Sequence, residues 1–372
     1  MKIAIVHDEL MRRGGAEQVV LCFHKAFPDA PIYTMAYQPE ATYPEFKNCN
    51  IKTSWFNKIV KNEKLMKILF FPLGVIAMKQ LDVTGFDVVL MSSTYCAKYV
   101  KLSPHTVVFN YCHSPFRLAW YPESYAEFLN AKGIKKIAYN LIIGMLQKID
   151  FKAAQRTNYF MTNANEVVHR IKDKYQFNEK IPVIKPSAAI ENFYISNEVK
   201  DYFLVVCRLE FYKKVDLVIE AFNQLGLPLI VVGKGSKEQE LKAIAKSNIT
   251  FKNGLSANEL SKLYAECKGL VFPQVEDYGI TPLEAAASGR PVIAFGKGGV
   301  LETMIPYKNN ASVATALFFD EQTPESLIEA IHKFNSLEFD SKFIRTHAEK
   351  FRSEVFIDQI KTYIFKKINR VC

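Results

Sequence analysis

Short apolar runs alternate with stretches of helical periodicity along the first half of the chain. The runs KIAIVHDE, PIYTMAY, FDVVLMSS and HTVVFNYCH are bounded by turn residues and rich in β-branched side chains, which is typical of buried strands. GGAEQVVLCFHKAF has the periodicity of a helix, and TNYFMTNANEVVHRIKDKY predicts a strand followed by a helix. Strands that alternate with helices predict a parallel sheet.

The same alternation begins again near residue 190. KDYFLVVCRLE, PLIVVGKGS, ITFKNG and GLVFP predict strands, and KKVDLVIEAFNQLG, ELKAIAKS and SANELSKLYAEC predict the helices between them. Before this second series, IPVIKPSAAIENFY has the prolines and small residues of a linker. The tail FRSEVFIDQIKTYIFKKINRV predicts one long amphipathic helix.

We therefore expect an α/β chain with two domains, each built on an open parallel sheet. A chain of 372 residues exceeds the size at which a single core usually keeps growing. The expected domains cover residues 1–190 and 191–350, and residues 351–372 are expected to form a helix that packs back on the N-terminal domain. In such folds ligands bind beyond the carboxyl ends of the strands, here in the crevice between domains, so residues just after strands are the candidates.

Composition is that of an ordinary globular protein, with 49% hydrophobic and 23% charged residues. The seven cysteines are odd in number and form no Cys-x-x-Cys pair, so we expect neither a disulfide framework nor a zinc site, but a reducing compartment. The start MKIAIVHDEL runs directly into a strand pattern without the order of a signal peptide. These features predict a cytoplasmic protein.

A net charge of +10 predicts attraction to an anionic partner. Two stretches, Trp55–Gln80 and Lys132–Arg156, mix lysines with apolar residues, and the apolar core of the first is about 14 residues, short of the roughly 20 that span a bilayer. They are either buried helices with solvated lysines or a basic amphipathic surface resting on anionic lipid, which would place the protein at the inner face of the plasma membrane. No recognised nucleic-acid motif accompanies the charge, so nucleic acid is not an expected partner.

Polar and glycine residues follow several of the predicted strands. Gly14 and Gly15 allow a sharp turn into a helix N-terminus, a ready site for an anion. Neither they nor Gly233 with Gly235 have the spacing of a dinucleotide fingerprint, which argues against an oxidoreductase built on the same sheet.

A second strand end carries His113 in the loop CHSPFRLAW, with Arg117 and Trp120 close behind. A histidine in such a loop is either structural or part of the site, and its place after a strand leaves both interpretations open.

In the second half, Arg208 ends a strand and Lys213 follows it closely. Two such cations can converge on one phosphate group, since arginine binds as a fork and lysine as a point charge. Cations at a helix N-terminus oppose the macrodipole unless an anion binds there.

Two glutamates flank a tyrosine-glycine turn in VEDYGITPLEAAASGRPVIA. Thr281 to Glu284 has the pattern of a capping box, with threonine as the N-cap and Glu284 reaching back to its amide. Local structure therefore offers a reason for Glu284 and none for Glu276.

Taken together, GGAE, YCHSPFRLAW, CRLEFYKKVDLVIEAF and EDYGITPLEAAASGRPVIA resemble family 4 of the glycosyltransferases, which has the GT-B fold of two Rossmann-like domains. The resemblance runs from residue 1 to about 305, and the phrase around His113 is similar to mannosyltransferases of surface polysaccharides. It implies retaining transfer of a hexose, such as mannose from GDP-mannose, to a glycan or polyprenyl-linked acceptor. The donor would be a GDP- or UDP-linked nucleotide-sugar.

The resemblance also assigns roles to residues. Arg208 and Lys213 match the pair that holds the donor diphosphate, Glu276 matches the residue that contacts the donor sugar, and Glu284 matches the residue that binds the ribose. The other matched positions are nucleotide-sugar contacts at Gly14, Gly15, Gly233, Gly279, Ile280 and Thr281, a catalytic-side position at His113, and an acceptor side at Arg117 and Trp120. One departure is Lys214, where the family usually has glycine.

The leaving nucleoside diphosphate gains negative charge that something must stabilise. The sequence contains no Asp-x-Asp pair to hold a metal, whereas Arg208, Lys213 and a helix dipole supply positive charge. We therefore expect a metal-independent enzyme without a cofactor. The alternative is a basic lipid-surface or nucleic-acid-binding α/β protein without transferase activity.

Overall fold

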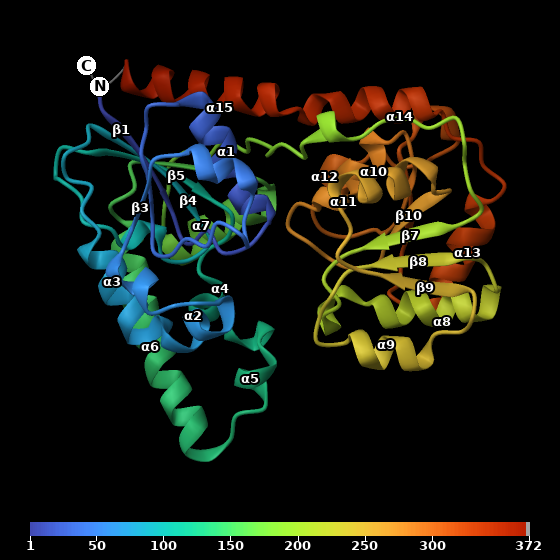
Figure 1. Ribbon diagram of the computed structural model, residues 1–372, viewed down its shortest axis with the longest axis horizontal. Coiled ribbons are helices and arrows are strands. Elements are labelled where there is room, and N and C mark those ends of the chain that lie inside the picture. Colours follow the sequence, from blue (N-terminus) through green and yellow to red (C-terminus); the bar gives the residue numbers. More distant parts are fainter. Residues whose placement is uncertain (370–372) are drawn as a thin grey trace. The chain divides into compact units, whose positions relative to one another are not determined.

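The computed structural model describes residues 1–369 and divides into two compact units (Figure 1). The first unit comprises Met1–Pro186 together with the tail from Phe356 onward, and the second comprises Ser187–Val355. The first unit's main segment ends at Pro186, four residues before the expected domain boundary at residue 190. Each unit is described by itself below.

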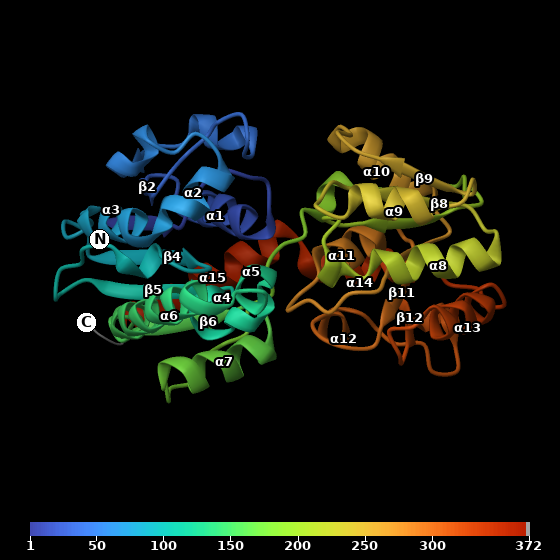
Figure 2. The same cartoon turned by 90° about the horizontal axis from the view of Figure 1, so that it is seen from below.

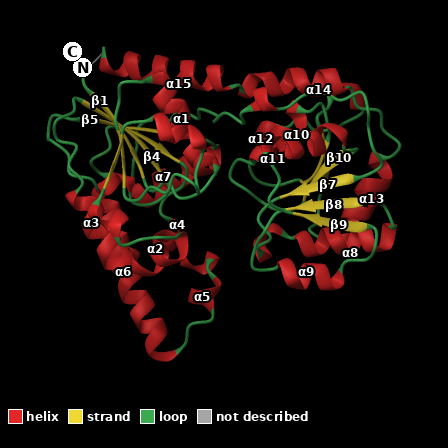
Figure 3. Cartoon of the chain, in the orientation of Figure 1, coloured by secondary structure: helices red, strands yellow, loops and turns green. Residues whose placement is uncertain are grey.

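Each unit is built on one six-stranded, fully parallel sheet (Figure 3). The strands of the first sheet, in spatial order, are β3 (Ile51–Thr53), β2 (Ile32–Thr34), β1 (Ile3–His7), β4 (Val88–Ser93), β5 (Val107–Cys112) and β6 (Tyr159–Thr162). Those of the second are β12 (Ala316–Phe319), β11 (Val292–Phe295), β10 (Gly269–Phe272), β7 (Phe203–Val206), β8 (Leu229–Val232) and β9 (Ile249–Lys252).

Helices connect the strands in both units. The helices of the first unit are α1 (Gly15–Ala26), α2 (Glu63–Leu69), α3 (Val75–Gln80), α4 (Arg117–Trp120), α5 (Ala126–Leu129), α6 (Gly133–Ala154) and α7 (Asn165–Tyr175). Those of the second are α8 (Val215–Leu225), α9 (Glu238–Ile244), α10 (Ala257–Glu266), α11 (Ile280–Ala287), α12 (Val300–Thr303), α13 (Pro324–Phe334) and α14 (Ser341–Ala348). The last helix, α15 (Ser353–Ile368), carries the chain from the second unit into the first.

Alternation along the strands explains why helices cover both faces of each sheet (Figure 2). Ala4 and Val6 of β1 lie in one core cluster with residues of α3 and α6, whereas Ile5 lies in another with residues of α1 and α15. In the second unit, Leu204 and Val205 of β7 divide between two clusters in the same way. Successive side chains of a strand point to opposite faces, so a strand buried on both faces must be apolar throughout.

The tail helix α15 packs on the first unit. Phe356 stacks on Phe23 of α1 with 6.2 Å between the ring centroids, and Ile360 and Ile364 are fully buried in the same cluster. The expected helix began at residue 351, but α15 begins at Ser353, and the end of the expected range, residues 370–372, lies outside the described residues.

These sheets confirm the expected fold class of two Rossmann-like α/β domains. The strands β3 and β12 lie outside the apolar runs that predicted strands, and both are at sheet edges. The two basic stretches are neither wholly buried nor wholly exposed. Across the described residues, no helix has both the length and the apolarity needed to cross a bilayer.

Candidate functional site

In the second unit, the loop after β7 carries the two predicted phosphate-binding cations. Arg208 is exposed, and its Nη2 donates to the hydroxyl of Tyr212 at 2.9 Å. Lys213 is only 8% exposed and closes the turn by donating its backbone N–H to the carbonyl of Glu210 at 2.9 Å. The two cations therefore differ: one is open to solvent and the other is held in place.

Glycine is required at position 233 because the loop after β8 passes very close to the loop after β7. Its φ is +154°, and a Cβ at this position would lie 1.9 Å from the carbonyl oxygen of Cys207. Any side chain at Gly233 would therefore push back the segment that presents Arg208. The sequence predicted Gly233 as a nucleotide contact, and the structure shows that it also shapes the neighbouring cation loop.

Lys213 and Glu276 are brought together as an ion pair. The pair joins Lys213 Nζ to Glu276 Oε1, and Gln274 Nε2 donates to the same oxygen at 3.2 Å. The side chain of Glu276 is 29% exposed, and no hydrogen bond to its Oε2 is found among the described residues. The carboxylate is thus anchored through one oxygen and able to accept a hydrogen bond through the other.

Gln274 is a residue that sequence reasoning missed. It is 2% exposed, and its Oε1 is buried without a hydrogen-bond partner among the described residues. A polar residue just after β10 and two positions before Glu276 was the available signal. Its place indicates that it orients the Glu276 carboxylate.

Lys214 stands where the family usually has glycine, and the structure shows why glycine suits this position. Its φ and ψ are +55° and +33°, in the left-handed region, at the N-cap of α8. This conformation costs a residue with a Cβ about 1–2 kcal/mol.

The predicted capping box at Thr281 is wrong. Helix α11 begins at Ile280 with Gly279 as its N-cap at φ +80°, and no side chain caps it. Thr281 is therefore already inside the helix and cannot be its cap. Gly279, Ile280 and Thr281 do form the N-terminus of α11, as the resemblance implied.

Glu284 bonds to another helix instead of the cap amide. Its Oε2 accepts from the hydroxyl of Tyr264 on α10 at 2.6 Å, and Tyr264 is fully buried. Burial raises the pKa of Glu284 to about 7, although the tyrosine hydrogen bond lowers it. The carboxyl group thus titrates near neutrality.

A glycine pair after β11 was also missed. The backbone N–H of Gly299 donates to the carbonyl of Glu276 at 2.7 Å, and a Cβ on Gly299 would lie 2.3 Å from the carbonyl oxygen of Asp277. Gly298 and Gly299 therefore let this loop pack against the backbone that presents Glu276. Two glycines just after a buried strand, the signal used for Gly14 and Gly15, would have found them.

In the first unit, Ser92 at the end of β4 joins two of the predicted positions. Its hydroxyl lies 2.9 Å from Nε2 of His113 and 3.5 Å from the carbonyl oxygen of Ala16. Gly14 is the N-cap of α1 and Gly15 its first residue. Ser92 therefore places the glycine turn beside His113, a bridge that the sequence did not reveal.

His113 is neutral at physiological pH. Burial and the charge of His7 lower its pKa to about 4. A neutral imidazole can donate from one ring nitrogen and accept at the other, and it contributes no positive charge to a phosphate site.

A buried network of charges supports the glycine turn. Glu17 of α1 is 1% exposed and lies 3.9 Å from Nε2 of His7 and 3.2 Å from Nε of Arg12. Arg12 also pairs with Glu9 at 2.7 Å. Burial alone would lower the pKa of His7, but the hydrogen bond and charge of Glu17 raise it above its usual value. Ion pairs before and after Gly14 therefore hold the turn that contains it.

The predicted acceptor-side residues Arg117 and Trp120 belong to the short helix α4. The indole N–H of Trp120 donates to Asp150 at 2.8 Å, and Asp150 is fully buried and paired with Lys98 at 2.8 Å. Trp120 therefore anchors the loop that follows His113. Arg117 is exposed on the same helix.

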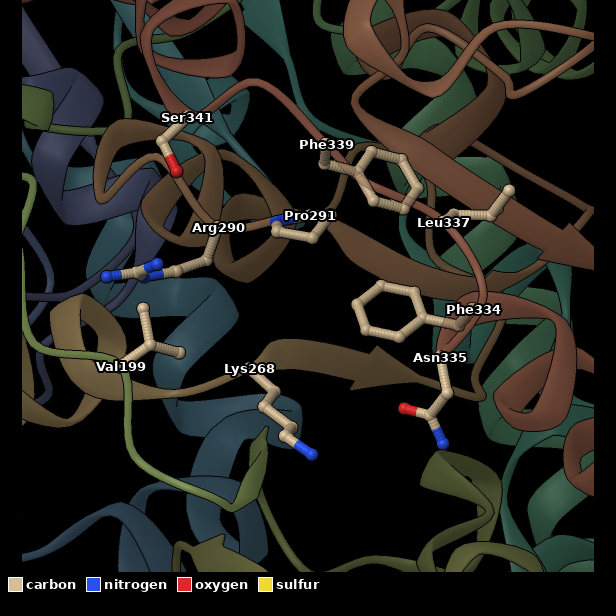
Figure 4. A pocket seen from close by; sticks show the side chains of 9 residues that line it. All are labelled: Val199, Lys268, Arg290, Pro291, Phe334, Asn335, Leu337, Phe339 and Ser341. Atoms are coloured by element: carbon tan, nitrogen blue, oxygen red, sulfur yellow. The ribbon is translucent and has the colours of Figure 1, made fainter.

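A cavity of about 250 Å³ lies elsewhere in the second unit (Figure 4). It is lined by the stacked rings of Phe334 and Phe339, with Lys268 and Arg290 opposite them. Lys268 and Arg290 precede β10 and β11, so the cavity lies at the amino ends of these strands. Lys213 and Glu276 lie beyond the carboxyl ends of the strands, at the opposite end of the sheet from the cavity.

The comparisons agree with this geometry. The family model described as "Glycosyl transferases group 1" matches residues 188–351, which lie within the second unit. The α-1,3/1,6-mannosyltransferase ALG2 of Candida glabrata is 24% identical over 83% of this chain and 79% of its own. The O-antigen chain mannosyltransferase C of Escherichia coli is 27% identical over 43% of this chain and 44% of its own.

Solved structures share the whole fold. Sucrose-phosphate synthase from Thermosynechococcus elongatus matches with a TM-score of 0.72 at 15% identity and covers 100% of both chains. HepE from Anabaena in complex with UDP-glucose matches with a TM-score of 0.69 at 14% identity, over 98% of this chain and 100% of its own. Residues 188–351 therefore match the glycosyl transferases group 1, and the chain is a glycosyltransferase with the GT-B fold.

Proposed function

We propose that this enzyme transfers mannose from GDP-mannose, with retention of configuration, to a glycan or polyprenyl-linked acceptor of a cell-surface polysaccharide. The relatives named above as mannosyltransferases support the sugar, and the O-antigen enzyme supports the class of product. The HepE complex contains UDP-glucose, so a UDP-linked hexose is the competing donor. The single observation that carries the proposal is the Lys213–Glu276 pair, which sets a cation and a carboxylate side by side at the strand ends.

These residues have complementary roles toward such a donor. Glu276 accepts hydrogen bonds from sugar hydroxyls through its open Oε2, while Lys213 and Arg208 face the diphosphate. The N-terminus of α11 adds the positive end of a helix dipole. Glu284 accepts hydrogen bonds from the ribose hydroxyls.

The reaction breaks the bond between the anomeric carbon and a phosphate oxygen, whose electron pair stays on the departing nucleoside diphosphate. The acceptor hydroxyl forms the new bond to the anomeric carbon, and its proton passes to the leaving phosphate. Arg208 and Lys213 offset the negative charge that develops on this phosphate. We propose that they do so without a metal ion, and that His113 acts as a neutral hydrogen-bonding group on the first unit.

A donor screen tests this proposal. The full chain is incubated with GDP-mannose, UDP-glucose and UDP-galactose, release of nucleoside diphosphate is measured, and thermal shifts with GDP and UDP are recorded in parallel. We expect release from GDP-mannose, a shift with GDP, and activity that survives EDTA. A shift with neither nucleotide would overturn the function, and a strict metal requirement would overturn the cation mechanism.

We also propose that the enzyme works in the cytoplasm, at the inner face of the plasma membrane, where a polyprenyl-linked acceptor would lie. This placement needs a surface that binds lipid, and the first unit offers a candidate.

A further inference from the structure

An apolar stripe on α6 is exposed to solvent in the first unit. The exposed fractions are 84% for Ile134, 61% for Ile137, 64% for Leu141 and 45% for Met145. Intervals of three and four residues place these side chains on one side of the helix. Single exposed apolar residues are normal, but a gathered set of large ones marks an interaction surface.

The second half of α6 holds this stripe in place. Leu146 and Ala153 are buried in the core beneath the first sheet, and Asp150 is fully buried. The first half of the helix and α5 extend away from the sheet (Figure 1). The exposed stripe therefore projects from a rigidly packed helix and is available without any unfolding.

The exposed charge along α6 has one sign. Between Glu127 and Asp150 the chain has no acidic residue. Exposed lysines precede the stripe, flank it and continue the same intervals beyond Met145, namely Lys132, Lys135, Lys148 and Lys152. Asp150 adds no negative charge to this surface because it is buried against Lys98.

We propose that the exposed face of α6, formed by Ile134, Ile137, Leu141, Met145 and the four lysines named above, docks on the surface of an anionic lipid bilayer. The apolar side chains enter the boundary between headgroups and acyl chains, and the lysines contact anionic headgroups. A second copy of the chain fits less well, because a symmetric contact would set the lysines of two faces against each other. The inference rests on the proposed function only in its purpose, which is to bring the enzyme to a lipid-linked acceptor.

Sedimentation with vesicles tests the apolar part. The full chain is mixed with phosphatidylcholine vesicles with or without phosphatidylglycerol. We expect sedimentation with the anionic vesicles only, and at least a tenfold loss of binding in the double variant Ile137→Asp with Leu141→Asp. The matched control is Ile244→Asp with Leu301→Asp, which alters residues of the second unit that are 45% and 51% exposed and should bind as the wild type does. Circular dichroism and the thermal midpoint verify that each variant is folded.

The lysines are tested separately. Lys148→Ala with Lys152→Ala should weaken vesicle binding and reduce its dependence on salt. Lys308→Ala with Lys350→Ala removes the same charge from exposed positions of the second unit and should change neither.

Three results would overturn the proposal. The first is that the Ile137→Asp, Leu141→Asp variant binds vesicles as strongly as the wild type does. The second is that the wild type binds uncharged vesicles as strongly as anionic ones. The third is that the wild type is a dimer and this variant is a monomer. The thermal shift with GDP or UDP is measured without vesicles on the same proteins. A failed docking surface with an intact nucleotide shift would therefore be distinguished from a failed function.

Discussion

Lys213 and Glu276 form an ion pair although 63 residues separate them along the chain. Lys213 follows β7 and Glu276 follows β10, and these two strands are hydrogen-bonded neighbours in a parallel sheet. The carboxyl ends of parallel strands meet at one edge, so residues just beyond them converge. The pair is therefore a direct consequence of strand order.

Glu276→Gln should reduce sugar transfer at least about 100-fold, because the variant keeps the shape of the side chain but loses the charge that grips the donor. Nucleotide binding should remain, since the carboxylate faces the sugar. Glutamine is preferred to alanine because its amide oxygen can still accept a hydrogen bond from the nearly buried Lys213, which truncation would leave without this acceptor.

The measurements for Glu276→Gln are initial rates with GDP-mannose and thermal shifts with GDP. Glu321→Gln, at an exposed position of the same unit, is the matched control and should leave both unchanged. An equal loss of GDP binding and transfer would contradict the assigned role.

Gln274→Ala should lower kcat about tenfold with little change in KM, since it removes one hydrogen bond that orients the carboxylate of Glu276. Gln274→Glu replaces the amide donor with a carboxylate that repels Glu276, so it should lower kcat at least as much.

Steady-state kinetics of the Gln274 variants provide the test. A residue that merely filled space could be replaced by leucine without loss of kcat, so an unchanged kcat in Gln274→Leu would reject the positioning role. Gln274→Leu, similar in size and without a donor, should behave like the alanine variant.

The fold could be predicted from the sequence because strands buried on both faces must be apolar throughout. Ile5 and Val6 of β1 face different helix layers, so both are apolar and the run is visible. The edge strand β3 has no fully buried residue, and its pattern was therefore weak. The Lys213–Glu276 pair could be anticipated only as two residues after strands; their contact depends on strand order.

Other features of the site are set by contacts that no local pattern records. The four residues from Thr281 to Glu284 fit a capping box, but Gly279 at φ +80° starts the helix earlier. Glu284 was therefore free to bond Tyr264, which lies 20 residues away. The bridge from Ser92 to His113 depends in the same way on the register between β4 and β5.

Lys214→Gly should raise the free energy of unfolding by up to about 1 kcal/mol, since glycine adopts the left-handed conformation without the cost of a Cβ but loses more entropy on folding. Urea denaturation measures the change. Lys214→Ala is the control: it removes the charge from the helix N-terminus but keeps the Cβ, so it should gain less stability than the glycine variant. Equal stabilisation by alanine would show that charge, not conformation, is responsible.

Glu284→Gln should change the pH dependence of stability. The pKa of Glu284 is raised from 4.5 to about 7, so the folded state holds this proton more tightly than the unfolded state. The resulting stabilisation is complete below about pH 4.5 and is lost as pH rises through 7. The loss is at most about 3 kcal/mol, and less where water reaches the carboxyl group. Thermal midpoints at pH 5 and pH 8 should therefore differ less in the variant than in the wild type.

The same titration should govern nucleotide binding if Glu284 holds the ribose, because an ionised carboxylate accepts hydrogen bonds from two hydroxyls better than a protonated one. The affinity of the wild type for GDP should rise as pH increases through about 7, and that of Glu284→Gln should be weaker and should depend less on pH, because only the terminal phosphate of GDP still titrates there. Glu9→Gln is the matched control, because burial also raises the pKa of Glu9 to about 7, but Glu9 belongs to the first unit. It should change the pH dependence of stability and leave that of GDP affinity intact. A pH dependence of GDP affinity that is as steep in Glu284→Gln as in the wild type would assign the titration to another group.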